Sequence, residues 1–365
     1  MKAILLPVLL LALVNAGCTN DENPLGQDED NNQLQPLSIQ AAVLTPEAVL
    51  SGSRTIVYGT AFPVDSEIGV HVAKGISSDA EGNKGAPGTP YSTTYFTNQM
   101  FHFNGSIWTP NADYNLSAEQ GTVYAYYPFD AAARFNTAGE ANIPVSIQPT
   151  GNITVKDGTS ATDNVNSSDA IITPAAGEKD FMYYAPGASR AVVSNRAHSA
   201  ILTMQHALAQ VSFRVIKSSN YPGAGNFTGY EIYDTNNMTN LIITSATSSV
   251  MSIVDGSLKF EAPSAGILAR NIINYQLGTD LAQATIVSNM VFPVATIGTG
   301  QLSVRLHIDA EDYTAALPVT VGKSDTWAVG KNYLYSVTLS GTGIEITSVS
   351  IVDWVNVDGG NIAIE

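Results

Sequence analysis

Short runs of alternating apolar and polar residues follow one another along most of the chain. In the first run, Leu37, Ile39, Ala41 and Val43 alternate with polar or small residues, which is the period of a half-buried β-strand. Gly, Pro, Asn, Asp and Ser separate the runs, and long amphipathic helical patterns are scarce. The pattern predicts an all-β fold built from β-sandwiches. Further runs of strand length lie at 55–58, 68–72, 123–127, 201–204, 211–216, 241–244, 272–277, 285–287, 302–308, 315–321 and 333–339.

The alternation changes phase near the C-terminus. Apolar residues fall at even positions in Ile344 and Ile346 and at odd positions in Val349 and Ile351. Because one extra residue turns every following side chain to the other face of a strand, this change predicts a β-bulge or bend near Ser348.

Residues 1–17 have the pattern of an export signal. Lys2 is followed by the apolar run 3–14 and then by Ala16, Gly17 and Cys18. A basic start, an apolar run and small residues before a cleavage point are typical of a signal peptide, and the run is shorter than the roughly 20 residues of a membrane span. The small pair before the cysteine resembles a bacterial lipobox, which implies cleavage between Gly17 and Cys18 and lipid on Cys18. The alternative is an ordinary secretory signal that ends near a cysteine.

Composition narrows the class of protein. The 365 residues include 32 acidic and 16 basic ones, for a net charge of −16, and a single cysteine. Clustered basic residues are needed to bind phosphates, so we expect no nucleic-acid partner. One cysteine excludes an internal disulfide framework and a multi-thiolate metal site. The acidic stretch 18–36 is predicted to be a flexible tether, and a new series of strands after residue 199 predicts two domains, 37–197 and 198–365.

The sequence contains no recognisable arrangement of catalytic residues. The five histidines lack any paired spacing on a helix face, so we expect hydrogen-bonded or surface histidines. The tyrosine-rich run 124–127 is predicted to pack in a core. We therefore expect no catalytic, cofactor-binding or metal site, and a hydrolase with an unrecognised carboxylate pair remains a weaker alternative. The histidines are His71, His102, His198, His206 and His307.

Four local patterns follow one another in a fixed order along the chain. They are Arg54-Thr55 with Gly59, Phe62, Asp65 and Ile68-Gly69-Val70; Phe101 to Trp108 followed by 123–128; Asp180 to Tyr183 followed by 204–213; and Trp327 followed by 330–335 and Val352-Asp353-Trp354. Together these patterns resemble the fimbrillin family of Bacteroides and Porphyromonas. The resemblance implies two transthyretin-like Greek-key β-sandwich domains in tandem and a structural pilus subunit that serves cell-surface adhesion.

The resemblance also implies a route of assembly. An arginine-specific trypsin-like protease would cut between Arg54 and Thr55 and release the lipidated N-terminus with the first strand. Arg54 is the only basic residue between Lys2 and Lys74, so such a protease has one possible cut there. The opened groove would then accept the segment 344–365 of a neighbouring subunit. The apolar donor residues would be Ile344, Ile346, Val349 and Ile351, and an ordinary final strand pair is the alternative interpretation of this segment.

Partners and location follow from the same resemblance. The expected partners are other pilus subunits, and before processing the membrane, through lipid on Cys18. The expected location is the outer membrane, the cell surface and the fimbrium. The alternative is a permanently lipidated surface adhesin or pilus anchor that binds a glycan or a host protein, in which Arg54 stays uncut.

Overall fold

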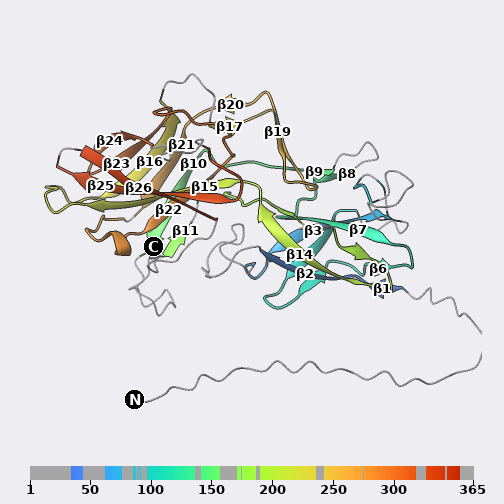
Figure 1. The fold of residues 1–365 in the computed structure, drawn as a ribbon. Coiled ribbons are helices and arrows are strands. Elements are labelled where there is room, and N and C mark those ends of the chain that lie inside the picture. The colour runs from blue at the N-terminus through green and yellow to red at the C-terminus, as the bar shows by residue number, and fades with distance from the viewer. Residues whose placement is uncertain are drawn as a thin grey trace, which may run out of the picture. The chain divides into compact units, whose positions relative to one another are not determined.

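The described residues are almost entirely strands and connecting loops (Figure 1). The computed structural model describes residues 34–43, 62–75, 85–87, 89, 91, 97–135, 141–156, 171–173, 175–185, 190–235, 242–273, 275–317, 326–341 and 343–353. Among them the only helical element is one 3₁₀ turn, Leu281–Gln283. Residues Gln33–Glu365 form one compact unit. The prediction of an all-β fold is confirmed.

One large sheet encloses the first apolar core. Its strand order is β2-β14-β12-β7-β3-β4-β5, with β13 beside β7. The two outermost strands, β2 and β5, also lie next to each other, so the sheet curls around its core. The strands are β2 (Ser38–Val43), β3 (Glu67–Lys74), β4 (Gln99–Phe103), β5 (Trp108–Pro110), β7 (Gly121–Tyr127), β12 (Met182–Tyr184), β13 (Val192–Val193) and β14 (Ser199–His206). The short pair β1 (Gln35–Pro36) and β6 (Asn115–Leu116) adjoins it.

Two further sheets enclose a second apolar core. A four-stranded sheet has the order β22-β15-β25-β26, and a six-stranded sheet has the order β11-β10-β21-β16-β23-β24. Phe213 and Tyr335 from the first and Tyr230 and Val304 from the second belong to the same buried cluster, which makes this pair of sheets a β-sandwich. The strands are β22 (Ile286–Val291), β15 (Ala209–Lys217), β25 (Lys331–Ser340), β26 (Gly343–Asp353), β11 (Ile171–Thr173), β10 (Thr150–Lys156), β21 (Leu268–Ile273), β16 (Phe227–Asp234), β23 (Leu302–Ile308) and β24 (Glu311–Ala316).

Several strand pairings cross the predicted boundary between residues 197 and 198. Strand β14 follows the boundary in sequence but pairs with β2 and β12, whereas β10 precedes it and pairs in parallel with β21. A small sheet, β19 (Leu258–Glu261), β18 (Ser248–Ser252), β9 (Ala141–Pro144) and β8 (Arg134–Phe135), also draws strands from both sides. Strands β17 (Ile243–Ser245) and β20 (Ser264–Ala265) form a separate pair. The division into 37–197 and 198–365 stays a prediction.

Candidate functional site: the terminal edge strands

Strand β2 is the first candidate, because it occupies the edge of the large sheet. It runs parallel to β14, with Ile39 opposite Ala200. The amide of Leu37 donates to the carbonyl of Tyr114 at 2.8 Å, and the amide of Ser38 donates to the carbonyl of His198 at 2.8 Å. Leu37 and Ile39 are only 4% and 3% exposed. Strand β2 therefore fills an apolar gap between β14 and β5.

Loss of β2 would open a groove. Burial of a Leu or Ile side chain stabilises a fold by about 1.5–3 kcal/mol each, and Leu37 and Ile39 both contribute to this core. Without them the β14 side chains Ala200, Leu202 and Met204, now 2% exposed or less, would face the gap. The outer backbone edge of β14 would also lose its hydrogen-bond partners. Such an edge beside an apolar groove is the kind of surface that accepts an added strand.

Strand β26 is the second candidate and lies at the edge of the four-stranded sheet, antiparallel to β25 (Figure 1). The pairing shifts register, because Ser336 lies opposite Ser348 and Val337 lies opposite Ile346. Thr347 is therefore the extra residue of a β-bulge, and the predicted bulge near Ser348 is confirmed.

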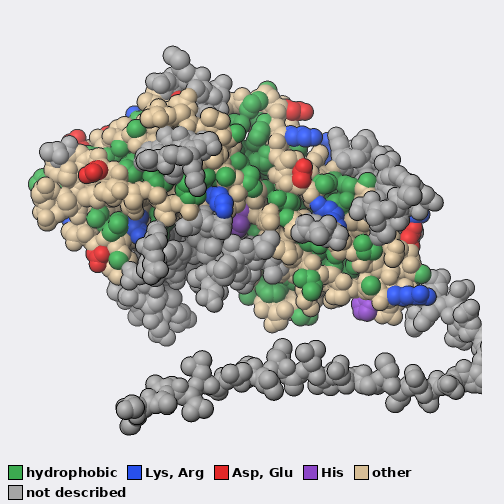
Figure 2. All heavy atoms as spheres, in the orientation of Figure 1, with side chains coloured by type: hydrophobic (Ala, Val, Ile, Leu, Met, Phe, Trp, Pro, Cys, Tyr) green, Lys and Arg blue, Asp and Glu red, His purple; other side chains and the backbone are tan. Residues whose placement is uncertain are grey.

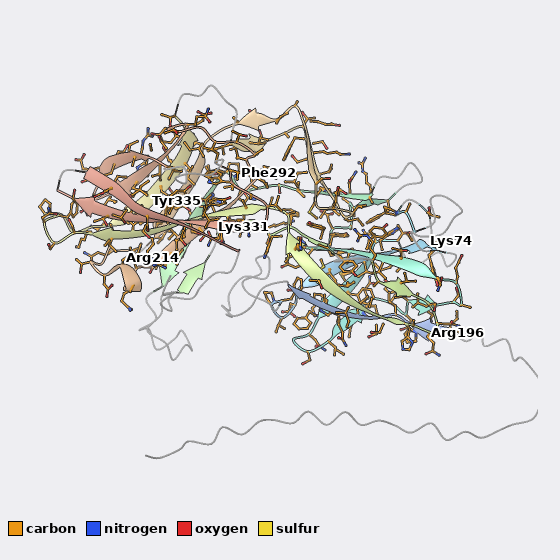
Figure 3. All side chains as sticks on the ribbon, viewed as in Figure 1. Lys74, Arg196, Arg214, Phe292, Lys331 and Tyr335 are labelled. Atoms are coloured by element: carbon orange, nitrogen blue, oxygen red, sulfur yellow. The ribbon has the colours of Figure 1, made fainter. Side chains whose placement is uncertain are left out.

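The bulge places all four predicted donor residues on one face of β26. Residues directly opposite each other in an antiparallel pair point to the same side, and each of the four lies opposite a buried residue of β25. Figure 3 marks Tyr335 and Lys331 on this partner strand. The pairs are Ile344 with Leu339, Ile346 with Val337, Val349 with Tyr335 and Ile351 with Tyr333.

The four side chains differ in how closely they pack. Ile344, Ile346 and Val349 are partly buried against the second core, whereas Ile351 is 43% exposed. An apolar strand that is paired on one edge and partly buried on one face is held less tightly than a central strand. The residues predicted for cleavage and lipidation, Gly17, Cys18, Arg54 and Thr55, lie outside the described residues, and those roles stay predictions.

The histidines have the structural roles expected from the sequence. The Nε2 atom of His71 lies 2.6 Å from the carbonyl oxygen of Pro87. In His206 and His307 the Nδ1 atom lies within 3.0 Å of an Asp carboxylate oxygen, Asp180 for His206 and Asp312 for His307. His198 is exposed, and the ring of His102 lies 3.6 Å from the Asp65 carboxylate. The prediction of hydrogen-bonded or surface histidines is confirmed.

The tyrosine-rich run forms the C-terminal half of β7. Tyr124, Tyr126 and Tyr127 are at most 4% exposed, so the predicted core packing is confirmed. Gly69 on β3 leaves room for the ring of Tyr126, because a Cβ atom at this position would lie 2.2 Å from it. Burial raises the pKa of Tyr126 and Tyr127, since each phenolate would lose its hydration.

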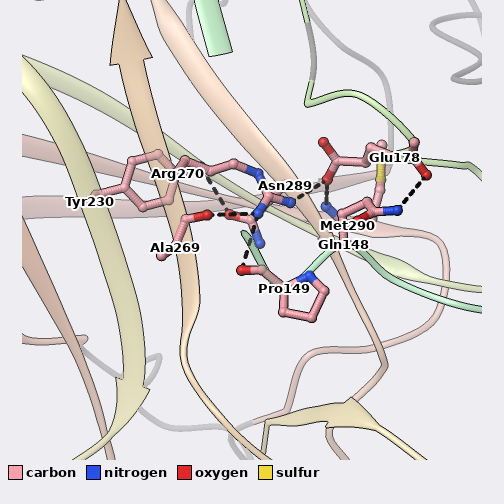
Figure 4. Close-up of polar contacts among 9 residues, drawn as sticks. Gln148, Pro149, Glu178, Tyr230, Ala269, Arg270, Asn289 and Met290 are labelled. Carbon is pink, nitrogen blue, oxygen red and sulfur yellow. Dashed lines mark hydrogen bonds and ion pairs between the residues drawn. The ribbon is translucent and has the colours of Figure 1, made fainter. Parts of the chain in front are cut away.

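A buried ion pair joins the loop before β12 to both sheets of the sandwich (Figure 4). The Nη2 atom of Arg270 donates to Glu178 Oε1 at 2.9 Å, and the Met290 amide donates to the same oxygen at 2.7 Å. Arg270 belongs to β21 and Met290 to β22, which lie in different sheets. Because both charges are almost completely buried, the pair is strongly coupled to the packing around it.

No sequence pattern predicted this ion pair. Its members are 92 residues apart, so no local spacing connects them. The available signal was Arg270 itself, which shares the buried face of β21 with the apolar residues Leu268 and Ile272. A charged residue at such a position requires a buried partner.

The described residues lack the features of two other kinds of site. No group of three or more potential metal ligands occurs in the part of the chain that the structure describes. Across those same residues, no helix has the length and apolar character required to cross a membrane. Lys and Arg side chains lie singly on the face shown in Figure 2, without a large basic patch.

The fold that carries these two edge strands is all-β. The sequence profile of the fimbrillin-like family matches residues 55–354, and the chain belongs to this family. A comparison with curated proteins gives no match.

Three solved structures share the fold. A candidate cell adhesion protein of Bacteroides ovatus has 17% identity and a TM-score of 0.57, over 89% of this chain and 100% of that one. A candidate cell adhesion protein of Bacteroides uniformis has 15% identity and a TM-score of 0.50, over 88% and 99%. A fimbrial protein of Bacteroides vulgatus has 13% identity and a TM-score of 0.50, over 79% and 93%.

Proposed function

We propose that the chain is a structural subunit of a surface pilus, exported as a lipoprotein and assembled by strand exchange after proteolysis. Membership of the fimbrillin-like family supports the pilus role and the contact with other pilus subunits. The same proposal includes adhesion at the cell surface and two transthyretin-like Greek-key sandwiches in tandem. No catalytic role forms part of it.

The observation that carries the proposal is the position of β2. This strand lies at a sheet edge and buries Ile39 together with Leu37, the residue just before it. It precedes Arg54, the only basic residue between Lys2 and Lys74. A cut after Arg54 would leave β2 attached to the remaining protein by non-covalent contacts alone.

Strand β26 supplies a suitable donor. Ile344 and Ile346 have the same spacing as Leu37 and Ile39, so their side chains could occupy equivalent positions in the groove. The bulge at Thr347 keeps Val349 and Ile351 on the same side, which extends the apolar face of the donor. Main-chain hydrogen bonds to β14 would then give affinity, and the apolar pockets would give register.

Lipid on Cys18 would hold the precursor at the outer membrane before assembly. The predicted tether, up to the start of β1 at Gln35, would separate the lipid from β2, and cleavage after Arg54 would release the subunit from this anchor. In this mechanism lipidation serves transport, and the mature pilus would contain no lipid.

The decisive experiment compares wild type with Arg54→Ala and Arg54→Lys in the native cell. For an arginine-specific protease, both variants should remain lipidated monomers in the membrane fraction. The lysine variant keeps the positive charge at position 54, so its failure to assemble would be due to the lost cleavage and not to the lost charge. Because trypsin also cuts after lysine, trypsin added to the purified Arg54→Lys variant should restore assembly. Filaments whose subunits still begin at Cys18 would refute the mechanism. A wild-type mature protein that keeps its lipid and an uncut Arg54 would instead support the anchor or adhesin role.

A further inference from the structure

One side of the six-stranded sheet is polar and open to solvent. On β23, Val304 and Leu306 are buried in the second core, so Arg305 and His307 point to the opposite side of the sheet, where their side chains are 36% and 30% exposed. Strands β10, β21, β16 and β24 contribute further polar residues to the same side (Figure 1). We call this side the outer polar face; its residues are Asn152, Asn271, Gly229, Glu231, Tyr233, Arg305, His307 and Asp312.

The strand register arranges these residues in rows across the sheet. Residues directly opposite each other on neighbouring strands point to the same side. One row crosses five strands, and a second row runs beside it, two residues further along each strand. Side chains from segments far apart in the sequence are therefore neighbours on this face. The first row is Asn152, Asn271, Gly229, His307 and Asp312, and the second is Thr150, Ala269, Glu231, Arg305 and Thr314.

Contacts among the side chains hold the outer polar face in one arrangement. Arg305 Nη1 donates to Glu231 Oε2 at 2.7 Å, and the guanidinium carbon lies 5.1 Å from the centre of the Tyr233 ring. His307 Nδ1 lies 2.6 Å from Asp312 Oδ1, and Nδ1 is the donor because an ionised carboxylate only accepts. Side chains that are already fixed lose little conformational entropy when a ligand binds.

The centre of the outer polar face lacks a side chain. Gly229 lies between Asn271 and His307 in the first row, and a strand spacing of about 4.8 Å puts these two neighbours roughly 10 Å apart across it. His307 Nε2 lies 3.9 Å from Glu231 Oε1, which is too long for a direct hydrogen bond. A ligand hydroxyl placed over Gly229 could bond to both of these atoms. Asn271 Nδ2 donates to Asn152 Oδ1 at 3.1 Å, so the amide on the other side of the glycine is fixed as well.

The chemistry of the outer polar face favours a neutral carbohydrate over an ion or a protein. Its charges are paired within the face, Arg305 with Glu231 and His307 with Asp312, so it offers hydrogen bonds rather than a net charge. Among the described residues on this side of the sheet, Ile273 at the margin is the one large aliphatic side chain that is exposed, whereas the core of a protein interface is apolar and depleted in charge. Sugar hydroxyls both donate and accept, which matches the amide, imidazole, guanidinium and carboxylate groups gathered here. The net charge of −16 also disfavours an acidic polysaccharide.

We propose that the outer polar face binds a neutral oligosaccharide, with sugar hydroxyls held between Asn271, His307 and Glu231. The proposal deepens the adhesion part of the proposed function and rests on it, because a subunit displayed at the cell surface presents this face to carbohydrates around the cell. Strands β2 and β26 belong to other sheets, so cleavage and strand exchange do not use the face. Binding and assembly can therefore be measured separately.

The test uses purified full chains on a printed oligosaccharide array. The array carries neutral oligosaccharides that end in galactose, glucose, mannose or N-acetylglucosamine, with sialylated galactosides as the charged comparison. The double variant Asn271→Ala/His307→Ala removes the two side chains that flank the central glycine. A second variant, Glu231→Gln, keeps the shape of its side chain but replaces the charged acceptor. The matched control is Asn142→Ala/His102→Ala, which changes the same residue types on β9 and β4.

We expect wild type and the control to bind neutral oligosaccharides, the double variant to bind at least about tenfold more weakly, and Glu231→Gln at least about threefold more weakly. Urea denaturation of each variant should match wild type within the small loss expected for an exposed ion pair. If the double variant is unfolded, the Glu231→Gln result decides.

Two results would overturn the proposal. One is a wild-type protein that binds no neutral oligosaccharide or binds only the sialylated ones, and the other is undiminished binding by both variants. Cleavage after Arg54 and filaments on cells are measured in parallel, and both should be normal in the variants. Absence of filaments from wild type would overturn the proposed assembly and leave the array result unaffected, so the two failures are distinguishable.

Discussion

The hydroxyl of Thr347 donates a hydrogen bond to the main-chain carbonyl of Ser336 at 3.2 Å, where β26 has one residue more than β25. This bond stabilises the bulge, and the bulge turns every later side chain of β26 to the opposite side of the sheet. Without the extra residue, Ile344 and Ile346 would point to the face opposite Val349 and Ile351. The apolar face of the strand thus depends on a single polar residue.

Deletion of Thr347 should divide this apolar face. One of the two apolar pairs must then turn to solvent, and the unfolding free energy should fall by about 2 kcal/mol or more. Hydrogen exchange of the amides in β26 should accelerate. Thr347→Ser keeps both the extra residue and the hydroxyl, so this variant should behave like wild type. Unchanged stability and exchange in the deletion variant would contradict our account of the bulge.

His71 should make stability depend on pH. Its ring stacks on Phe135 with centroids 4.4 Å apart, and burial lowers its pKa from 6.5 to about 4. The unfolded chain therefore takes up the proton first, and the unfolding free energy should fall as the pH drops from about 6.5 to 4, by roughly 3 kcal/mol in total. Above pH 6.5 the contribution is fully present.

The structure gives the reason for this low pKa. Nε2 of His71 donates to the carbonyl of Pro87, so Nδ1 would take the added proton. Among the described residues, Nδ1 is buried without a hydrogen-bond partner. The control is His71→Gln, which can still donate to Pro87 but does not titrate. Subtraction of its denaturation curves from those of wild type isolates the histidine, and a flat difference between pH 6.5 and 4 would disprove the assignment.

Glu178→Gln should destabilise the protein by about 3–5 kcal/mol, because it leaves the buried guanidinium of Arg270 without its counter-ion. Urea denaturation provides the measurement. The double variant Glu178→Met/Arg270→Met should recover part of the loss, since apolar residues of similar size can replace a buried ion pair. Glu231→Gln serves as the control, because the ion pair of Glu231 with Arg305 is more exposed: the Glu231 side chain is 24% exposed and that of Arg305 is 36% exposed. Loss of this pair should lower the unfolding free energy by less than about 1 kcal/mol. If Glu178→Gln and Glu231→Gln lowered the unfolding free energy equally, the buried pair would not have the larger structural role that we assign to it.

Cys18→Ser should stop lipid attachment and leave unprocessed or mislocalised precursor. The chain contains no other cysteine, so a radiolabelled fatty acid should label wild type and not the variant. Ala16→Gly keeps a small residue before the cleavage point and should be processed normally. Labelling of Cys18→Ser at the wild-type level would exclude this cysteine as the lipid site.

Local patterns in the sequence determined the strands, the bulge and the buried tyrosines. Side-chain alternation reports which face of a strand is apolar, and a change of phase reports an extra residue, so both β2 and the bulge of β26 could be predicted. The order of charged, apolar and small residues at the N-terminus likewise depends on neighbours in sequence and predicted the export signal.

Tertiary structure decided which of these strands meet. Periodicity does not name a partner, so it gave no indication that β14 pairs with β2 or that β10 pairs with β21. The Glu178–Arg270 pair and the contact between the turns of Val64 and Gly105 join residues that are far apart in the chain. Such contacts arise only when distant segments pack to bury their apolar faces together, and their geometry depends on the whole fold rather than on any local run of residues.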